Sequence, residues 1–287
     1  MRIAIVGCGE VGSTYARALL VAGDHDVVID DPRPEVAAWA AEHDLTLHRT
    51  AGPWLADVDA AWVCVAGDLA HRVITQMHEY LARGVTIIDL TTASPEDKAR
   101  SAVLLDDRGV YIDAVIMGAI AMNGVATPLL GAGPHAEGAM SVLADLGAPV
   151  RTLPDAAPGD AAALKLLRSV LTKGLEALGV ECLVAAERMG VRDQLPAVLA
   201  DIDAGGLTPF VDAVVRTHPL HAERRQHEVR RAGLQLAGHR GNPSLLAATE
   251  ERFAATVAAT HATPPPPDVA DHVDDAVRWL LTTTPTP

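Results

Sequence analysis

The chain has 287 residues, 49% of them hydrophobic and 21% charged, and this composition excludes a disordered or fibrous protein. Its formal net charge of −14 at pH 7 argues against a partner held through the phosphates of a nucleic-acid backbone. Cys8, Cys64 and Cys182 show neither the spacing of a zinc site nor that of a disulfide framework. Without a recognisable signal peptide or an apolar run that could cross a bilayer, the sequence predicts a reduced, cytoplasmic protein.

Short apolar runs alternate with helical segments in the first half of the chain. Residues 2–6 predict a strand that stops at Gly7, and residues 11–21 predict a helix directly after it. Further strands are expected at 27–29, 60–66 and 85–90, with helices at 34–42 and 69–82. This alternation is typical of a doubly wound parallel sheet, so we expect an α/β domain over residues 1–157.

The second half has no convincing strands. Residues 160–188 contain no proline and are rich in alanine and leucine, which predicts one helix roughly 40 Å long. Because such a helix exceeds the needs of a small core, part of it is expected to bury a second subunit or the first domain. Shorter helices are expected at 195–204, 208–216, 221–237, 244–260 and 269–281. We therefore expect an all-α domain over residues 158–287, and a homodimer.

A glycine-rich motif follows the first predicted strand, where residues 7–12 read GCGEVG. Glycines at this place allow a tight turn and a close approach of the backbone to a pyrophosphate at a helix N-terminus. The context predicts a dinucleotide site of Rossmann type, and a purely structural glycine turn is the alternative. The residues expected to bind the cofactor here are Gly7, Gly9, Glu10, Val11 and Gly12.

Two acids follow the second predicted strand, about 20 residues beyond the motif. Asp30 and Asp31 are both candidates for the ribose hydroxyls, and strand alternation favours Asp31, which shares a face with Ile29. A ribose-binding acid favours NAD. Arg33 could instead pair with the 2′-phosphate of NADP, or be a solvated residue that opens a helix. We expect NAD or NADP, with NAD slightly favoured.

Several features of the sequence together resemble the β-hydroxyacid dehydrogenases, relatives of 6-phosphogluconate dehydrogenase. They are the glycine motif, Asp31, the segment DLTTASP at 89–95 and the lysine-bearing helix. The resemblance spans most of the chain. The segments at 111–118 and 164–174 resemble a branch of this superfamily that has its own C-terminal domain of unknown function. The resemblance implies an NAD(P)-dependent oxidoreductase that acts on a small hydroxyacid-like alcohol or ketone in the cleft between a Rossmann domain and a helical domain.

The resemblance also implies roles for individual residues. Lys165 matches the family's catalytic lysine, which exchanges a proton with the substrate hydroxyl. Its apolar neighbours in sequence predict partial desolvation and a lowered pKa, whereas a lysine that snorkels from an apolar face is the alternative. Thr91 and Thr92 are expected to bind the substrate, and Thr92 also the cofactor, although Thr92 or Ser94 could instead cap the helix that begins at Pro95. Further expected contacts are Val65 and Ala66 with the cofactor, and Met117, Gly118, Ser169 and Lys173 with the substrate.

Some positions depart from the family's pattern. Met117 stands where better-known members have a serine, and Ser169 stands where they commonly have asparagine, so the substrate stays unassigned. Imine reductases of the same superfamily typically have aspartate or tyrosine in place of the lysine, so Lys165 favours a carbonyl or alcohol. An imine reductase-like enzyme and a non-catalytic dinucleotide-binding protein remain the alternatives. The twelve histidines match no zinc pattern, and no metal or membrane contact is expected.

Overall fold

The computed structural model describes residues 1–238 and 244–283. The chain divides into two compact units, Met1–Val170 and Leu171–Pro287, and the division falls inside the long helix α8 (Asp160–Arg188). The first unit is α/β and the second is helical, which confirms the predicted fold class. The domain boundary expected at residue 157 stays a prediction.

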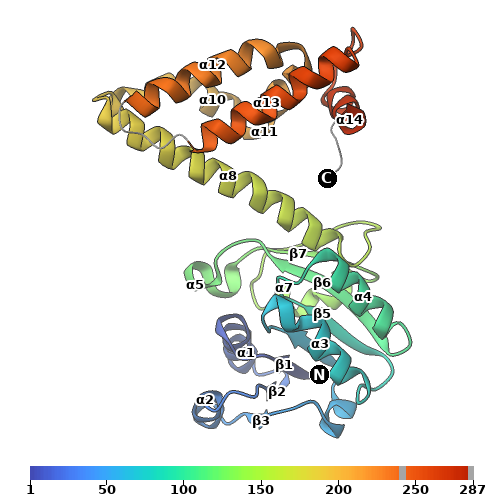
Figure 1. The fold of residues 1–287 in the computed structure, drawn as a ribbon. Helices are drawn as coiled ribbons and strands as arrows, with labels where there is room; N and C mark the ends of the chain where they lie inside the picture. The colour runs from blue at the N-terminus through green and yellow to red at the C-terminus, as the bar shows by residue number, and fades with distance from the viewer. Residues whose placement is uncertain (239–243, 284–287) are drawn as a thin grey trace. The chain divides into compact units, whose positions relative to one another are not determined.

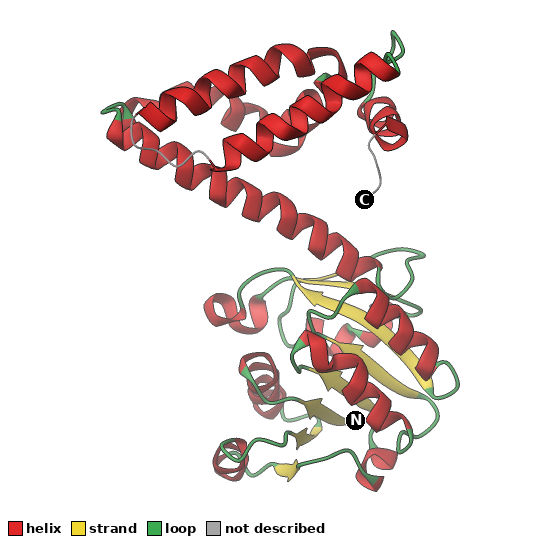
Figure 2. Ribbon diagram, in the orientation of Figure 1, coloured by secondary structure: helices red, strands yellow, loops and turns green. Residues whose placement is uncertain are grey.

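An eight-stranded sheet forms the centre of the first unit (Figure 2). Its strand order is β3-β2-β1-β4-β5-β6-β7-β8. The strands are β1 (Arg2–Val6), β2 (Asp26–Asp30), β3 (Thr46–His48), β4 (Ala60–Val63), β5 (Val85–Asp89), β6 (Gly109–Ile116), β7 (Leu129–Ala132) and β8 (Val150–Thr152). The order reverses at β1, which lies between β2 and β4. In open α/β sheets, ligands bind outside the carboxyl ends of the strands at such a switch point.

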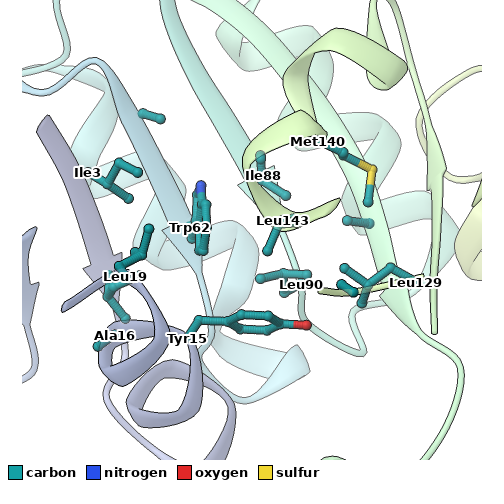
Figure 3. Close-up of a cluster of buried hydrophobic side chains, with 14 of the residues drawn as sticks. Ile3, Tyr15, Ala16, Leu19, Trp62, Ile88, Leu90, Leu129, Met140 and Leu143 are labelled. Atoms are coloured by element: carbon teal, nitrogen blue, oxygen red, sulfur yellow. The ribbon is translucent and has the colours of Figure 1, made fainter. Parts of the chain in front are cut away.

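Helices cover both faces of this sheet (Figure 1). The helices of the first unit are α1 (Glu10–Ala22), α2 (Val36–Glu42), α3 (Gly67–His78), α4 (Pro95–Leu105), α5 (Ile120–Asn123), α6 (Ala136–Ala139) and α7 (Ser141–Asp145), with single-turn segments η1 (Pro53–Asp57) and η2 (Gly124–Ala126). Alternate β1 residues point to opposite faces: Ile3 and Ile5 pack with α1 and α7, whereas Ala4 and Val6 pack with α3 and α4. In the first of these clusters, Tyr15 meets Trp62 edge to face (Figure 3).

One strand pair of the sheet is antiparallel. β7 runs antiparallel to β6, and β8 then pairs parallel with β7. Residues 117–128 link β6 to β7 and form only the short segments α5 and η2. A connection without a long helix returns the chain beside the strand it has just left instead of crossing the face of the sheet. The predicted parallel sheet is confirmed, with this one pair as an exception that the prediction did not include.

The second unit consists of helices. Helix α8 has the bounds that the sequence predicted, and the chain then forms η3 (Arg192–Gln194), α9 (Leu195–Val198), α10 (Ala200–Gly205), α11 (Leu207–Arg216), α12 (His218–Gly238), α13 (Ser244–Ala262) and α14 (Val273–Thr283). Helix α12 packs against α13, and α11 packs against α14. Among the described residues, no helix combines the length and apolar character needed to cross a membrane.

The carboxyl end of β2 buries two acids in succession. Asp30 is the last residue of β2 and is 7% exposed, and Asp31 directly after it is 2% exposed. Burial, together with the neighbouring charge of Asp31, raises the pKa of Asp30 to about 6. The folded protein therefore holds the Asp30 proton more strongly than the unfolded chain does, and its stability falls as the pH rises from about 4 to about 6.

We expect Asp30→Asn to stabilise the ligand-free protein at pH 7.5 by up to about 3 kcal/mol, because it removes a buried charge. At pH 4 the gain should fall below about 1 kcal/mol, since the Asp30 carboxyl is then protonated in the folded protein and only partly ionised in the unfolded chain. Urea unfolding at the two pH values measures the difference. Asp24→Asn, at an exposed position, is the matched control. An equal gain at both pH values would contradict the prediction.

Candidate dinucleotide and substrate site

The glycine motif forms a tight turn between β1 and α1. Gly7 has a φ of +91°, and a Cβ placed there would lie 2.8 Å from Cγ1 of Val65. A Cβ on Gly12 would lie 2.0 Å from the carbonyl oxygen of Gly7, so the first turn of α1 packs directly on the motif. A Cβ on Gly9 would meet nothing within 4 Å. Gly9 begins α1 without a side-chain cap, which leaves backbone N–H groups of the first turn for an anion.

A pocket of about 880 Å³ extends from this turn across the carboxyl ends of β2 and β4 to one side of α3. Its volume, and its mostly apolar lining with a few charged side chains, are those of a small-molecule site. Three arginines, Arg33, Arg49 and Arg72, contribute to the lining. The predicted cofactor residues that line it are Gly7, Gly9, Asp30, Asp31, Arg33, Val65 and Ala66. The other predicted cofactor residues, Glu10, Val11, Gly12 and Thr92, lie outside the lining.

Asp31 links the end of β2 to the glycine turn. One carboxylate oxygen accepts the N–H of Cys8 at 2.8 Å and Nη2 of Arg33 at 2.7 Å. The other accepts the backbone N–H and Nε of Arg33, both at 2.9 Å. Burial opposes the Asp31 charge, but the hydrogen bonds from Arg33 and Cys8 outweigh burial and hold the pKa of Asp31 below its ordinary value. Four donors thus occupy the acceptor positions of one carboxylate.

A buried ion cluster lies below the carboxyl ends of β5 and β6. The Lys98 side chain from α4 is fully buried, and its Nζ lies 2.9 Å from Oδ1 of Asp113 and 3.5 Å from Oδ1 of Asp89. The same amine donates hydrogen bonds to the carbonyls of Asp89 at 2.8 Å and Ala114 at 3.1 Å. The Tyr111 hydroxyl donates to Oδ2 of Asp89 at 2.6 Å. The cluster therefore holds α4 against both strands.

The second oxygen of Asp113 holds the start of α8. It accepts the N–H groups of Gly159 and Ala162, each at 3.0 Å. A carboxylate at the N-terminus of a helix satisfies unpaired N–H groups and interacts favourably with the helix dipole. Lys165 follows Ala162 by three residues, so this contact fixes the turn of α8 that bears the predicted proton carrier.

Asp89 also shapes the loop that follows β5. Its Oδ1 accepts the N–H of Thr91 at 2.9 Å, and the Thr91 hydroxyl accepts the N–H of Ala93 at 3.2 Å. Thr91 is buried, whereas Thr92 is exposed. A Cβ on Gly67 would lie 2.6 Å from the carbonyl carbon of Thr92, so this loop packs on the first residue of α3. Thr92 therefore lies next to the segment 65–66 that lines the dinucleotide pocket.

Lys165 is partly buried in the first unit. Its pKa is lowered mainly by burial and further by the charges of Lys98 and Arg168, while Asp113 acts in the opposite direction. A lysine whose pKa is lowered toward neutrality exchanges protons more readily at physiological pH. The desolvation expected from the apolar sequence around Lys165 agrees with this result.

Met117 and Gly118 follow β6. Met117 packs against a buried cluster that includes Ala161 and Ala162 of α8, so the structure places it near the turn that precedes Lys165. Gly118 is exposed, and a Cβ there would lie 3.1 Å from Cγ2 of Thr127. The structure thus brings the segment after β6 and the start of α8 together within the first unit.

The two remaining predicted substrate residues lie further along α8. The Ser169 hydroxyl donates to the carbonyl of Lys165 at 2.9 Å, which is a bond within the helix. Lys173 belongs to the second unit, is 76% exposed and pairs with Glu176 at 2.6 Å. Their proposed contacts with a substrate stay predictions.

Sequence analysis did not identify Lys98, Asp89 and Asp113 as site residues. A signal was present, because each acid belongs to an apolar strand segment, VTIID at 85–89 and YIDAVI at 111–116. A charge in a buried strand requires a partner. The partner was one of only three lysines in a chain that uses mostly arginine.

Comparison with known proteins shows which protein families the chain is similar to. A family model described as the NAD binding domain of 6-phosphogluconate dehydrogenase matches residues 2–153, and a domain of unknown function, DUF1932, matches residues 186–256. A probable 3-hydroxyisobutyrate dehydrogenase of Mycobacterium bovis is 28% identical over 127 residues, which are 44% of this chain and 43% of that protein.

Solved structures share the fold over nearly the whole chain. A conserved hypothetical protein of Sinorhizobium meliloti 1021 has a TM-score of 0.62 at 26% identity, covering 98% of this chain and 97% of that one. An imine reductase of a Pseudomonas species has a TM-score of 0.72 at 22% identity, covering 96% and 99%. With the family match over residues 2–153 and the glycine turn at the pocket, the chain belongs to the family that has the NAD-binding domain of 6-phosphogluconate dehydrogenase.

Proposed function

We propose that the protein is an NAD(P)-dependent oxidoreductase that acts on the CH–OH group, or the corresponding carbonyl, of a small hydroxyacid-like substrate. The main support is the partly buried Lys165, whose pKa is lowered and whose helix turn Asp113 holds in the same unit as the dinucleotide pocket. The bound nicotinamide supplies the hydride chemistry. Lys165 donates a proton to the carbonyl oxygen in reduction and accepts the hydroxyl proton in oxidation.

The glycine turn fits the dinucleotide's pyrophosphate. Gly9 borders open space and the N–H groups of the first turn of α1 lack a side-chain cap, as an approaching phosphate requires. The adenosine end would occupy the arginine-lined part of the pocket. The fully bonded Asp31 supports the 2′-phosphate alternative over the slightly favoured NAD, because a carboxylate that meets four donors has little capacity left for ribose hydroxyls. Arg33, which is 47% exposed at the pocket, is the proposed 2′-phosphate ligand.

We expect the protein to bind NADPH more tightly than NADH, as measured by parallel fluorescence titrations. Arg33→Ala should weaken NADPH binding by about tenfold or more, because it removes a charge-assisted hydrogen bond to the phosphate. The same change should leave NADH binding unchanged or improve it, since it frees Asp31. Arg100→Ala, an exposed arginine on α4, is the control. Tighter binding of NADH would return the assignment to Asp31, and binding of neither nucleotide would contradict the proposed function.

Reduction of an imine is the second candidate. The fold similarity to the Pseudomonas imine reductase supports it, but the lysine at position 165 favours an oxygen atom as the proton acceptor. This preference rests on the resemblance, in which imine reductases typically have aspartate or tyrosine in place of the lysine. A panel of small hydroxyacids, ketoacids and cyclic imines, followed by nicotinamide absorbance, separates the two.

On whichever substrate is turned over, Lys165→Met should lower kcat/KM by at least about a hundredfold, because it removes the proton carrier. Lys165→Arg should be similarly inactive, since an arginine keeps the charge and does not release its proton. Binding of the nucleotide should stay within about twofold of wild type in both variants, because neither touches the dinucleotide pocket. Substantial turnover by Lys165→Arg would show that Lys165 supplies charge and not a proton.

A homodimer is part of the proposal. Helix α8 leaves large apolar side chains at exposed positions, among them Leu171, Leu175 and Leu178, which recur at helical spacing on one side. A surface stripe of this kind is typical of an interface between proteins. Sedimentation at micromolar concentration should show a dimer, and Leu171→Glu/Leu175→Glu should yield a monomer. Leu234→Glu, at an exposed position of α12, should remain dimeric. A monomeric wild-type protein would contradict this part of the proposal.

A further inference from the structure

We propose that Lys98 is a positioning residue whose buried charge, held between Asp89 and Asp113, offsets the Asp113 carboxylate at the start of α8 and so eases proton loss from the Lys165 amine. This inference rests on the proposed function, in which Lys165 carries the proton. Lys98 itself is fully buried and does not line the dinucleotide pocket, so it acts on Lys165 through its charge, both directly and by offsetting the charge of Asp113.

The surroundings of Lys98 compensate for the burial of its ammonium group. An isolated ammonium in a protein interior is costly, and it persists when carboxylates and carbonyls surround it. Here the amine has two carboxylates within 3.5 Å and donates to two backbone carbonyls. A purely structural link between α4 and the sheet does not require these charges, because buried ion pairs are often replaced by apolar residues without loss of stability. The cluster thus suggests a role for the charge itself.

Asp113 connects this charge to the proton carrier. One oxygen of its carboxylate lies 2.9 Å from Nζ of Lys98, and the other accepts two N–H groups from the start of α8. The ammonium therefore offsets the negative charge that Asp113 would otherwise direct at the helix turn of Lys165. Without Lys98, that carboxylate would draw a proton onto the Lys165 amine.

Three charged groups act on the Lys165 amine: Lys98 from α4, Asp113 from β6 and Arg168 from α8 itself. Burial and the charges of Lys98 and Arg168 lower the pKa of Lys165, and Asp113 raises it. Arg168 is exposed, so dissolved salt screens its charge, whereas the fully buried Lys98 is screened much less. A salt-independent part of the effect is therefore expected from Lys98.

The same cluster also reaches the loop on the cofactor side. Asp89 contacts Lys98 and holds the N–H of Thr91, so one buried amine lies between the Thr91–Thr92 loop and the start of α8. Replacing Lys98 should therefore change the protonation of Lys165 and also loosen this loop. The two effects can be distinguished, because only the change in protonation shifts the titration curve of Lys165.

The test uses NMR of protein labelled with ¹³C in its lysines, of which the chain has three. The Lys165 signal is assigned by its loss in Lys165→Arg, and its pH titration needs neither substrate nor nucleotide. Lys98→Met should raise the proton affinity of Lys165 by about tenfold, the order expected for the loss of one nearby charge. Arg100→Met, which removes an exposed positive charge from the same helix, should leave the titration unchanged. An unchanged Lys165 titration in folded Lys98→Met would overturn the inference.

Lys98→Met leaves two buried carboxylates without their partner and could unfold, so a second pair of variants is needed. Asp113→Asn should lower the proton affinity of Lys165, because it removes the negative charge while the amide oxygen still accepts from α8. The double variant Lys98→Met/Asp113→Asn should have a higher affinity than Asp113→Asn alone. Equal affinities in these two variants would show that Lys98 contributes nothing, and the inference would fail.

The outcome is separable from that of the proposed function. If Lys98→Met shifts the Lys165 titration but Lys165→Met remains active, the electrostatic link stands and the catalytic role of Lys165 fails. If the enzyme oxidises its substrate with Lys165 as the base, the low-pH limb of kcat/KM for oxidation should move to higher pH in Lys98→Met by the same factor as the titration. A fall in kcat/KM at every pH, without displacement of that limb, would indicate loosening of the loop alone and would overturn the inference.

Discussion

The carboxylate of Asp113 is the interaction on which the candidate site depends. It lies in the last parallel strand before the sheet reverses, and its two oxygens serve different elements: one meets Lys98 of α4, and the other caps the start of α8. Residues far apart in the sequence are thus joined by one buried side chain. Each partner also satisfies the charge or the polar atoms of Asp113, so removing any one of them leaves a buried group unpaired. The cost of that unpaired group is much larger than the net stabilisation that the contact provides.

The high cost of an unpaired buried carboxylate also shapes the dinucleotide side of the sheet. Asp30 and Asp31 are consecutive and both buried at the end of β2, but their surroundings differ. Asp31 receives four donors and stays charged, whereas burial beside that charge raises the pKa of Asp30 to about 6. The carboxyl edge of a parallel sheet collects such polar ends from several strands. In this chain, Asp30, Asp31 and Asp89 all lie at that edge. Asp31 is held by Arg33 and Cys8, and Asp89 by Lys98, Tyr111 and the N–H of Thr91.

Sequence periodicity predicted those strands and helices whose burial pattern is set by their own residues. The runs that became β1 and β5, and the proline-free stretch that became α8, have a burial pattern that is set locally, so their bounds were predicted closely. The antiparallel β7 depended on the path of the chain after β6, which a local pattern does not contain. Likewise Lys98 lies in a helix with charged neighbours, where a lysine normally faces water. Its burial follows from two acids that the fold brings to it from β5 and β6.

The choice of lysine over arginine supports the separate roles of Lys98 and Lys165. The chain has 23 basic residues and only three are lysines, so arginine is the ordinary choice for a positive charge. A proton carrier must be able to lose its proton, which the guanidinium group does not do. A charge held between two carboxylates and two carbonyls must be compact, and an ammonium group with three rotatable donors meets that need better than a planar fork. The roles proposed for Lys98 and Lys165 thus both call for lysine in place of arginine, and Asp113 acts on both.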